Sequence, residues 1–122
     1  MTTMMPPKPN CRRGDVVLVL YPNSDLRTAK TRPALVVQAD NLQTGLPQLI
    51  VAMITSRLSR ANHLSRVTVQ VGTPIGRRSG LLTDSVVATD NLATILEAAI
   101  DRVIGVLPMT DVDTALRHTL KL

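Results

Sequence analysis

Runs of β-branched and aliphatic residues, bounded by glycine, proline and other turn formers, recur along the chain. The first run, RGDVVLVLY at 13–21, is closed by Pro22, a punctuation typical of a buried strand. The segment HLSRVTVQV instead alternates, with Val67 and Val69 facing one way, so we expect its other face to contact water. On this basis the sequence predicts six strands, at 13–21, 33–38, 48–55, 63–71, 81–89 and 102–107.

The segments between these runs are rich in turn formers and charged residues. Residues 22–32 predict a long loop, and the glycine-rich, basic segment 72–80 predicts a turn. The segment 90–101 fits a helix and an extended chain equally well by periodicity. Apolar residues at helical spacing over 111–122 predict a terminal helix, which Thr110 would cap. The expected fold is mainly β (α+β), a small, strongly bent antiparallel β-barrel with a C-terminal helix packed against it.

Length and composition fit one small domain. A chain of 122 residues with 44% apolar residues can bury a core. Its longest apolar runs are far shorter than the roughly 18–20 residues that cross a bilayer, so we expect no membrane partner. One cysteine, Cys11, cannot form an internal disulfide, and the first residues lack the apolar stretch of a secretory signal, which favours a cytoplasmic protein. We expect a disordered tail over 1–11 and a folded domain over 12–122.

The positive charge is concentrated in the middle of the chain. Residues 26–83 carry eight Lys and Arg residues against Asp40 alone, a net charge of +7, whereas residues 84–122 carry −3. This bias favours a polyanionic partner, and phosphate suits the forked donors of arginine, although solubility alone is the simpler interpretation. Tyr21 is the only aromatic residue, which argues against a single-strand binder built on aromatic stacking.

Several common catalytic signatures are absent from the sequence. His63 and His118 lie far apart, with no Cys or Glu at ligand spacing, so no metal site and no metal cofactor are expected. The chain has no GxxxxGK[ST] phosphate loop, no GxGxxG and no GxSxG, which argues against nucleotide-dependent and α/β-hydrolase chemistry.

Four blocks of sequence, in their order along the chain, resemble the PemK/MazF family of toxin endoribonucleases. These blocks are RRGDVVLVLYPNSD, TRPALVVQ, LIVAMITS and LLTDSVVATDNLATI, and the resemblance extends over residues 12–122. It implies an SH3-like barrel with a C-terminal helix, a homodimer, and cleavage of single-stranded RNA without a metal ion. It also implies a cognate antitoxin, and operator DNA as a partner only through the antitoxin complex.

The resemblance also implies two catalytic residues. The arginine before Pro-Ala, after the long first loop, is Arg32, and the Thr/Ser at the end of the third predicted strand is Thr55. In metal-free cleavage the ribose 2′-OH attacks the adjacent phosphorus, and a guanidinium and a hydroxyl can stabilise the charge that builds on the phosphoryl oxygens. Without the resemblance, Arg32 could simply flank a strand and Thr55 could bond to local backbone.

Residues close to these two are the candidates for binding RNA phosphates. Arg27 and Lys30 precede Arg32, whereas Ser56, Arg57 and Arg60 follow Thr55. Asp90 matches the aspartate of the family's Asp-Gln pair, with Asn91 in place of glutamine. An arginine that one branch of the family has two residues before this aspartate is Ala88 here, and a basic residue often found shortly after it is Ala93.

Two other interpretations stay open from the sequence. The chain could be a non-catalytic protein of the toxin fold that acts through RNA, a protein target or operator DNA with its antitoxin. It could also be an unrelated small basic barrel that binds nucleic acid. If the chain is an endoribonuclease toxin, the net charge of +7 over residues 26–83 predicts an antitoxin whose disordered, acidic and apolar tail covers the arginines. The apolar last third of the chain predicts a homodimer.

Overall fold

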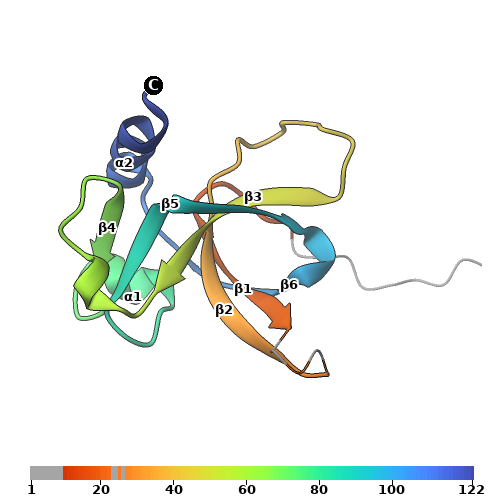
Figure 1. Ribbon diagram of the computed structural model, residues 1–122, viewed down its shortest axis with the longest axis horizontal. Helices are drawn as coiled ribbons and strands as arrows, with labels where there is room; N and C mark the ends of the chain where they lie inside the picture. The colour runs from red at the N-terminus through yellow and green to blue at the C-terminus, as the bar shows by residue number, and fades with distance from the viewer. Residues whose placement is uncertain (1–9, 23–24, 26) are drawn as a thin grey trace, which may run out of the picture.

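The computed structural model describes residues 10–22, 25 and 27–122. One antiparallel sheet of six strands, in the order β4-β5-β3-β2-β1-β6, forms most of this part of the chain (Figure 1). The strands are β1 (Asp15–Pro22), β2 (Ala29–Val36), β3 (Gln48–Thr55), β4 (Arg66–Val69), β5 (Ser85–Leu96) and β6 (Ile100–Val106). With the helix described below, this confirms the predicted mainly β, α+β fold with a C-terminal helix.

Breaks in the strand register bend the sheet. Between β3 and β5 the pairing shifts from Ala52–Leu92 to Met53–Ala88, so three residues of β5 have no partner in β3 at that point. Two further shifts interrupt the pairing of β1 with β6. Such bulges increase local twist and curvature, which lets a sheet wrap around its own core.

The bent sheet buries apolar residues on both faces. Val16, Leu35 and Val87 belong to one core cluster, which also contains Val112 of the C-terminal helix. The neighbouring residue Val17 belongs to a second cluster on the opposite face. Burial on both faces explains why β1 and β3 are continuous apolar runs instead of alternating ones.

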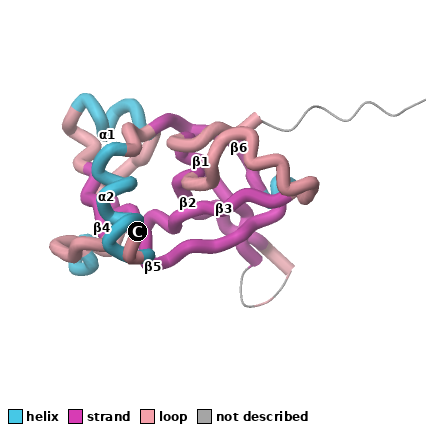
Figure 2. The backbone as a smooth tube through the Cα atoms, turned by 90° about the horizontal axis from the view of Figure 1, so that it is seen from above, coloured by secondary structure: helices cyan, strands magenta, loops and turns pink. Residues whose placement is uncertain are grey.

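Both helices lie with β4 at one end of the molecule (Figure 2). The long helix α2 (Thr110–Leu120) buries Val112 and Ala115, which confirms the predicted amphipathic helix. Its N-cap residue is Met109 and no side chain caps it, so the predicted cap by Thr110 is wrong. The short helix α1 (Pro74–Ser79) replaces the predicted turn, because the Thr73 hydroxyl accepts a hydrogen bond from the Gly76 amide at 3.0 Å.

A close backbone approach joins α1 to the edge strand β6. Gly80 ends α1 with a φ of 71°, and a Cβ there would lie 2.0 Å from the carbonyl oxygen of Ile104. A Cβ at Gly105 would lie 2.4 Å from the carbonyl carbon of Ser79. Only glycine fits these two positions, and their contact fixes the segment between α1 and β5 against β6.

The predicted strand boundaries differ from the structure in instructive ways. The third strand, 48–55, is confirmed at both ends. The second begins at Ala29 instead of Pro33, the fourth is shorter, and the fifth begins at Ser85. The uncertain segment 90–101 continues β5 to Leu96, passes through the 3₁₀ turn η2 (Glu97–Ala99) and enters β6.

The predicted N-terminal tail lies mostly outside the described residues. Cys11, which the sequence analysis assigns to that tail, is half-buried and packs against the second core cluster. Burial, reinforced by the Asp15 carboxylate, raises the pKa of its thiol. In the part of the chain that the structure describes, no helix has the length and apolar character needed to cross a membrane.

Candidate functional site

An open groove of about 920 Å³ begins where β3 stops pairing with β2. Its walls come from β1, β2, β3, β5 and β6 and from the segments that follow β3 and α1. Because the sheet bends, residues far apart in the sequence meet in this groove.

The groove is strongly cationic. Four arginines line it, and none of the described residues that line it is acidic. Asp40, the single carboxylate of the basic block, accepts a hydrogen bond from the Arg13 amide and lies outside the groove. The groove therefore favours a polyanionic ligand. The arginines are Arg32 of β2, Arg57 and Arg60 of the segment after β3, and Arg102 of β6.

Arg32 lies inside β2, whereas the predicted strand at 33–38 places it just before that strand. It pairs with Val19 of β1, whereas β3 pairs with β2 only from Ala34 to Val36. The first half of β2 thus has no β3 partner and is exposed, while its last three residues are buried. This leaves the Arg32 guanidinium free to reach a ligand in the groove.

Thr55 is the last residue of β3 and pairs with Val86 of β5. Its hydroxyl oxygen accepts a hydrogen bond from the backbone amide of Arg57 at 3.2 Å. A hydroxyl that accepts through a lone pair keeps its proton for a donor bond. The local turn thus holds the Thr55 side chain in place and leaves it able to donate to a phosphoryl oxygen.

Ser56, Arg57 and Arg60 follow Thr55 in an exposed segment that borders the groove. The segment contains the 3₁₀ turn η1 (Leu58–Arg60), closed by hydrogen bonds from the Arg60 amide to the Arg57 carbonyl at 3.1 Å and from the Ala61 amide to the Leu58 carbonyl at 3.0 Å. No residue of η1 is buried, so apolar packing contributes little to its position.

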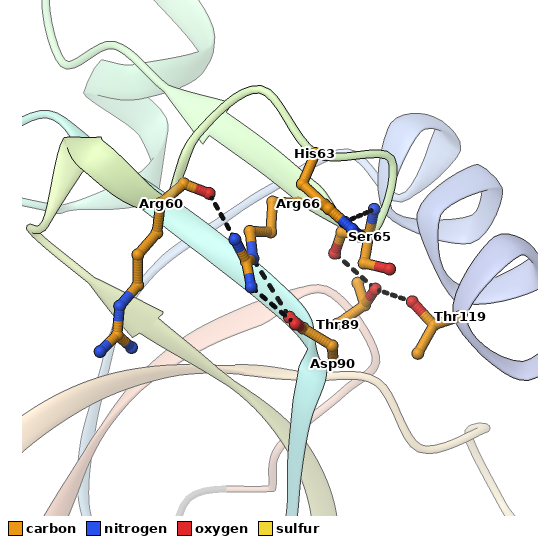
Figure 3. A network of polar contacts seen from close by, with 7 residues as sticks. All are labelled: Arg60, His63, Ser65, Arg66, Thr89, Asp90 and Thr119. Atoms are coloured by element: carbon orange, nitrogen blue, oxygen red, sulfur yellow. Dashed lines mark hydrogen bonds and ion pairs between the residues drawn. The ribbon is translucent and has the colours of Figure 1, made fainter.

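The guanidinium of Arg66 joins this segment to β5 (Figure 3). It forms a fork with the Asp90 carboxylate, Nη2 to Oδ2 at 2.8 Å and Nε to Oδ1 at 3.4 Å, and its Nη1 donates to the Arg60 carbonyl at 3.0 Å. Hydrogen bonding from Arg66 holds the pKa of Asp90 below its usual value. Figure 3 shows the Arg60 side chain extending away from this pair.

The groove offers charge stabilisation to a phosphate. Guanidinium groups and the Thr55 hydroxyl can surround a phosphate, but no carboxylate and no imidazole is among the described residues that line the groove. Nor do the described residues contain a group of three or more His, Cys, Asp and Glu that could hold a metal ion. These features suit a phosphodiester ligand.

Comparison with known protein families identifies the family of this chain. The model of the PemK-like, MazF-like toxins of type II toxin-antitoxin systems matches residues 12–121. The chain belongs to this family. The match covers almost the full length, so the whole described domain, groove included, is the family domain. Among curated proteins, no sequence matches the chain.

Solved structures of toxins share the fold. The Mycobacterium tuberculosis toxin MazF-mt6 is 24% identical, with a TM-score of 0.67 over 88% of this chain and 97% of that one. A mycobacterial endoribonuclease in complex with its cognate antitoxin is 21% identical, with a TM-score of 0.68 over 92% and 96%. The MazE-MazF complex of Deinococcus radiodurans is 16% identical, with a TM-score of 0.69 over 92% and 96%.

Three candidates of this PemK-like chain do not line the groove. Arg27 and Lys30 are exposed in and after the connection between β1 and β2. The Asp25 carboxylate accepts the Arg27 amide at 2.9 Å, and this bond, with that from the Thr28 amide, lowers the pKa of Asp25. Asp90 is held by Arg66, while its neighbour Asn91 does line the groove.

Two of the positions at which the sequence analysis finds a departure from the family pattern, Ala88 and Ala93, lie on β5. Ala88 is buried and pairs directly with Arg66 of β4, so the guanidinium next to Asp90 comes from the neighbouring strand. Ala93 lines the groove, where a longer basic side chain would narrow it.

Arg102 is a groove arginine that the sequence analysis did not identify as a site residue. It lies on β6 opposite Leu18 of β1, and its side chain is 70% exposed. Its Nε lies 3.8 Å from Oδ2 of Asp101. The sequence did not indicate Arg102 because it belongs to residues 84–122, which carry a net negative charge. Only the pairing of β6 with β1 brings it close to the arginines of residues 26–83. Tyr21 also lines the groove, and its hydroxyl donates to the Met53 sulfur at 3.1 Å.

Proposed function

We propose that this toxin is an endoribonuclease that cleaves single-stranded RNA in the arginine-lined groove without a metal ion. One observation carries the proposal. Arg32 and Thr55, which the resemblance to the family implies as catalytic, line the same groove with three further arginines, and the described residues that line it include no carboxylate. Arg57, Arg60 and Ser56 are proposed to bind the RNA backbone next to them.

In this proposal the ribose 2′-OH is the nucleophile. A bond forms between the 2′ oxygen and the adjacent phosphorus, and the bond from phosphorus to the 5′ oxygen breaks. The 2′ proton is lost to solvent and the 5′ oxygen takes up a proton, so the products carry a 2′,3′-cyclic phosphate and a 5′-OH. The Arg32 guanidinium and the Thr55 hydroxyl stabilise the negative charge that builds on the phosphoryl oxygens.

The direct test is incubation of the purified protein with a long single-stranded RNA in EDTA. We expect cleavage with the two ends named above and none of an all-DNA strand, which has no 2′-OH. Loss of activity in the chelator, or products that carry a 5′-phosphate, would contradict this mechanism.

A non-catalytic function is the second candidate, and one observation favours it. No imidazole or carboxylate lines the described groove, so proton transfer has no obvious side chain to serve it. Such a protein would bind RNA, a protein target or operator DNA with its antitoxin. The same incubation distinguishes the two functions, because a binder retains RNA in a filter assay and leaves it intact.

We further propose that the protein forms a homodimer, acts in the bacterial cytoplasm and is inhibited by a cognate antitoxin. Ile95 and Ile100, part of the apolar last third, are used by the chain's own core, but Leu96 and Val103 are 55% and 37% exposed. These exposed side chains support pairing of two copies. Sedimentation at micromolar concentration should show a species of twice the 13.2 kDa chain mass. A single species with the mass of one chain would contradict the dimer.

A further inference from the structure

We propose that Arg66 and Asp90 form a positioning pair, which holds the Arg57–Arg60 segment so that its two arginines face RNA in the groove. Neither side chain lines the groove. The inference rests on the proposed binding of RNA there, and it gives Asp90 a structural task instead of contact with RNA.

The segment between β3 and β4 needs such an anchor. Its residues from Ser56 to Leu64 are exposed except for Ala61, which is half-buried. A segment without buried apolar side chains opens easily, and polar contacts must then restrict it. The Arg60 carbonyl receives such a contact, from Arg66 Nη1 at 3.0 Å.

Arg66 is itself fixed from two sides. Its fork with Asp90 spans from β4 to β5, and its side chain is 26% exposed, so the pair is partly shielded from water. Its backbone amide donates to the His63 carbonyl at 2.9 Å. The planar guanidinium directs its donors to the carboxylate and to the Arg60 carbonyl in one fixed geometry, which the compact ammonium of lysine does not reproduce.

The start of β4 is held in the same way (Figure 3). The Ser65 carbonyl accepts from both the Thr89 hydroxyl at 2.6 Å and the Thr89 amide at 3.0 Å. The Thr89 hydroxyl in turn lies 2.7 Å from that of Thr119 on α2. The backbone that carries Arg66 is therefore fixed to the buried part of the fold, and Arg66 in turn fixes the position of Arg60.

Charge alone and positioning predict opposite results for Asp90→Asn. Removal of a carboxylate adds net positive charge near the groove, which by itself tightens the binding of RNA. Loss of the fork frees Arg66 and the Arg57–Arg60 segment, which weakens binding because the arginines must be ordered again when RNA binds. The sign of the change in Kd thus separates the two explanations.

The test measures the Kd for a single-stranded RNA with 2′-deoxy substitutions, which the protein cannot cleave, together with hydrogen exchange of the Arg60 and Ala61 amides. We expect Asp90→Asn to raise the Kd by about threefold or more and to speed exchange of these two amides by about fivefold or more. Arg66→Lys, which preserves the charge, should do the same. In an Arg60→Ala, Arg57→Ala background, Asp90→Asn should have almost no further effect on the Kd.

The matched control is Asp113→Asn, which breaks the ion pair of Asp113 with Arg13 on a carboxylate that does not line the groove. It should leave the Kd and the exchange of both amides unchanged. An unchanged or lower Kd in Asp90→Asn, a full effect in the double-alanine background, or unchanged exchange would each overturn the positioning role. If the wild-type protein does not bind RNA, the proposed function fails, and the exchange measurement alone then decides whether the pair orders the segment.

Discussion

At the scale of the residue, pairing decides which arginines are available to a ligand. Arg32 is exposed because β3 pairs with β2 only from Ala34 to Val36. The part of β2 that contains Arg32 is therefore not covered by β3. Thr55 is available because β3 ends there and the Arg57 amide fixes its hydroxyl. A hydrogen bond to an ionised phosphate is charge-assisted whether its donor is a guanidinium or a hydroxyl, so loss of either side chain should be costly.

We expect Arg32→Ala and Thr55→Ala each to lower the rate of RNA cleavage by more than about tenfold, with the arginine change the larger. Loss of one donor to a transition-state oxyanion costs roughly 10² to 10³ in rate. Single-turnover cleavage of a labelled RNA measures the effect, and circular dichroism checks that both variants fold. Arg117→Ala, an exposed arginine of α2 outside the groove, is the control. Wild-type rates in both variants would show that these residues are not catalytic.

Arg102 should act as a fourth phosphate contact. Arg102→Ala should weaken binding of uncleavable single-stranded RNA and lower the slope of log K against log salt by about 0.7, the value for one lost phosphate contact. Titrations at several salt concentrations measure the slope, and Arg117→Ala again controls for net charge. An equal loss of slope in both variants would mean that Arg102 contributes only to the general charge.

At the scale of the element, sequence patterns located the strands and long-range pairing set their ends. β3 was predictable at both limits, since its pairing with β5 extends only one residue beyond the apolar run 49–54 at each end. β2 was not, because the exposed residues Ala29–Arg32 pair with β1 and carry no apolar signal. The basic loop residues and the Arg32 and Thr55 motifs were visible in the sequence, but Arg102 and the Arg66–Asp90 pair depend on contacts between strands that no local pattern records.

The ion pair of Arg13 with Asp113 on α2 gives a pH-dependent prediction. Hydrogen bonding from Arg13 lowers the pKa of Asp113 in the folded protein, so this carboxylate stabilises the fold above its unfolded pKa of about 3.9, and the contribution is lost as pH falls through the lower, folded value. Asp113→Asn should therefore reduce the free energy of unfolding at pH 7 by about 1 kcal/mol or less, since the pair is partly exposed.

Urea unfolding at neutral pH and below about pH 3 measures this difference, which should shrink at the acid end. Asp111→Asn is the matched control, because it removes a carboxylate from the same first turn of α2 and leaves the bond to Arg13 intact. A difference of the same size at both pH values would contradict the contribution of the charged pair.

At the scale of the whole molecule, the fold sorts charge by face. Arginines from β2, β6 and the segment after β3 converge on one groove, whereas the Asp40 carboxylate lies elsewhere. The convergence gives a local field much stronger than the net charge of +5 suggests. A cellular inhibitor of this toxin must compete with RNA for that groove or act through another surface.

We expect the antitoxin to compete with RNA for the groove. An antitoxin tail that lays carboxylates along the groove arginines and buries its own apolar side chains should exclude RNA, so antitoxin and uncleavable RNA should compete for the protein. RNA binding through phosphate contacts should weaken steeply with salt, whereas the antitoxin complex should weaken less because burial of apolar side chains releases no counterions. Competition with labelled RNA at two salt concentrations, in the presence of the neighbouring gene's product, measures both effects. Arg57→Ala and Arg60→Ala should weaken the binding of both RNA and antitoxin, whereas Arg117→Ala should weaken the binding of neither. Simultaneous binding without mutual loss of affinity would show that control acts through another surface.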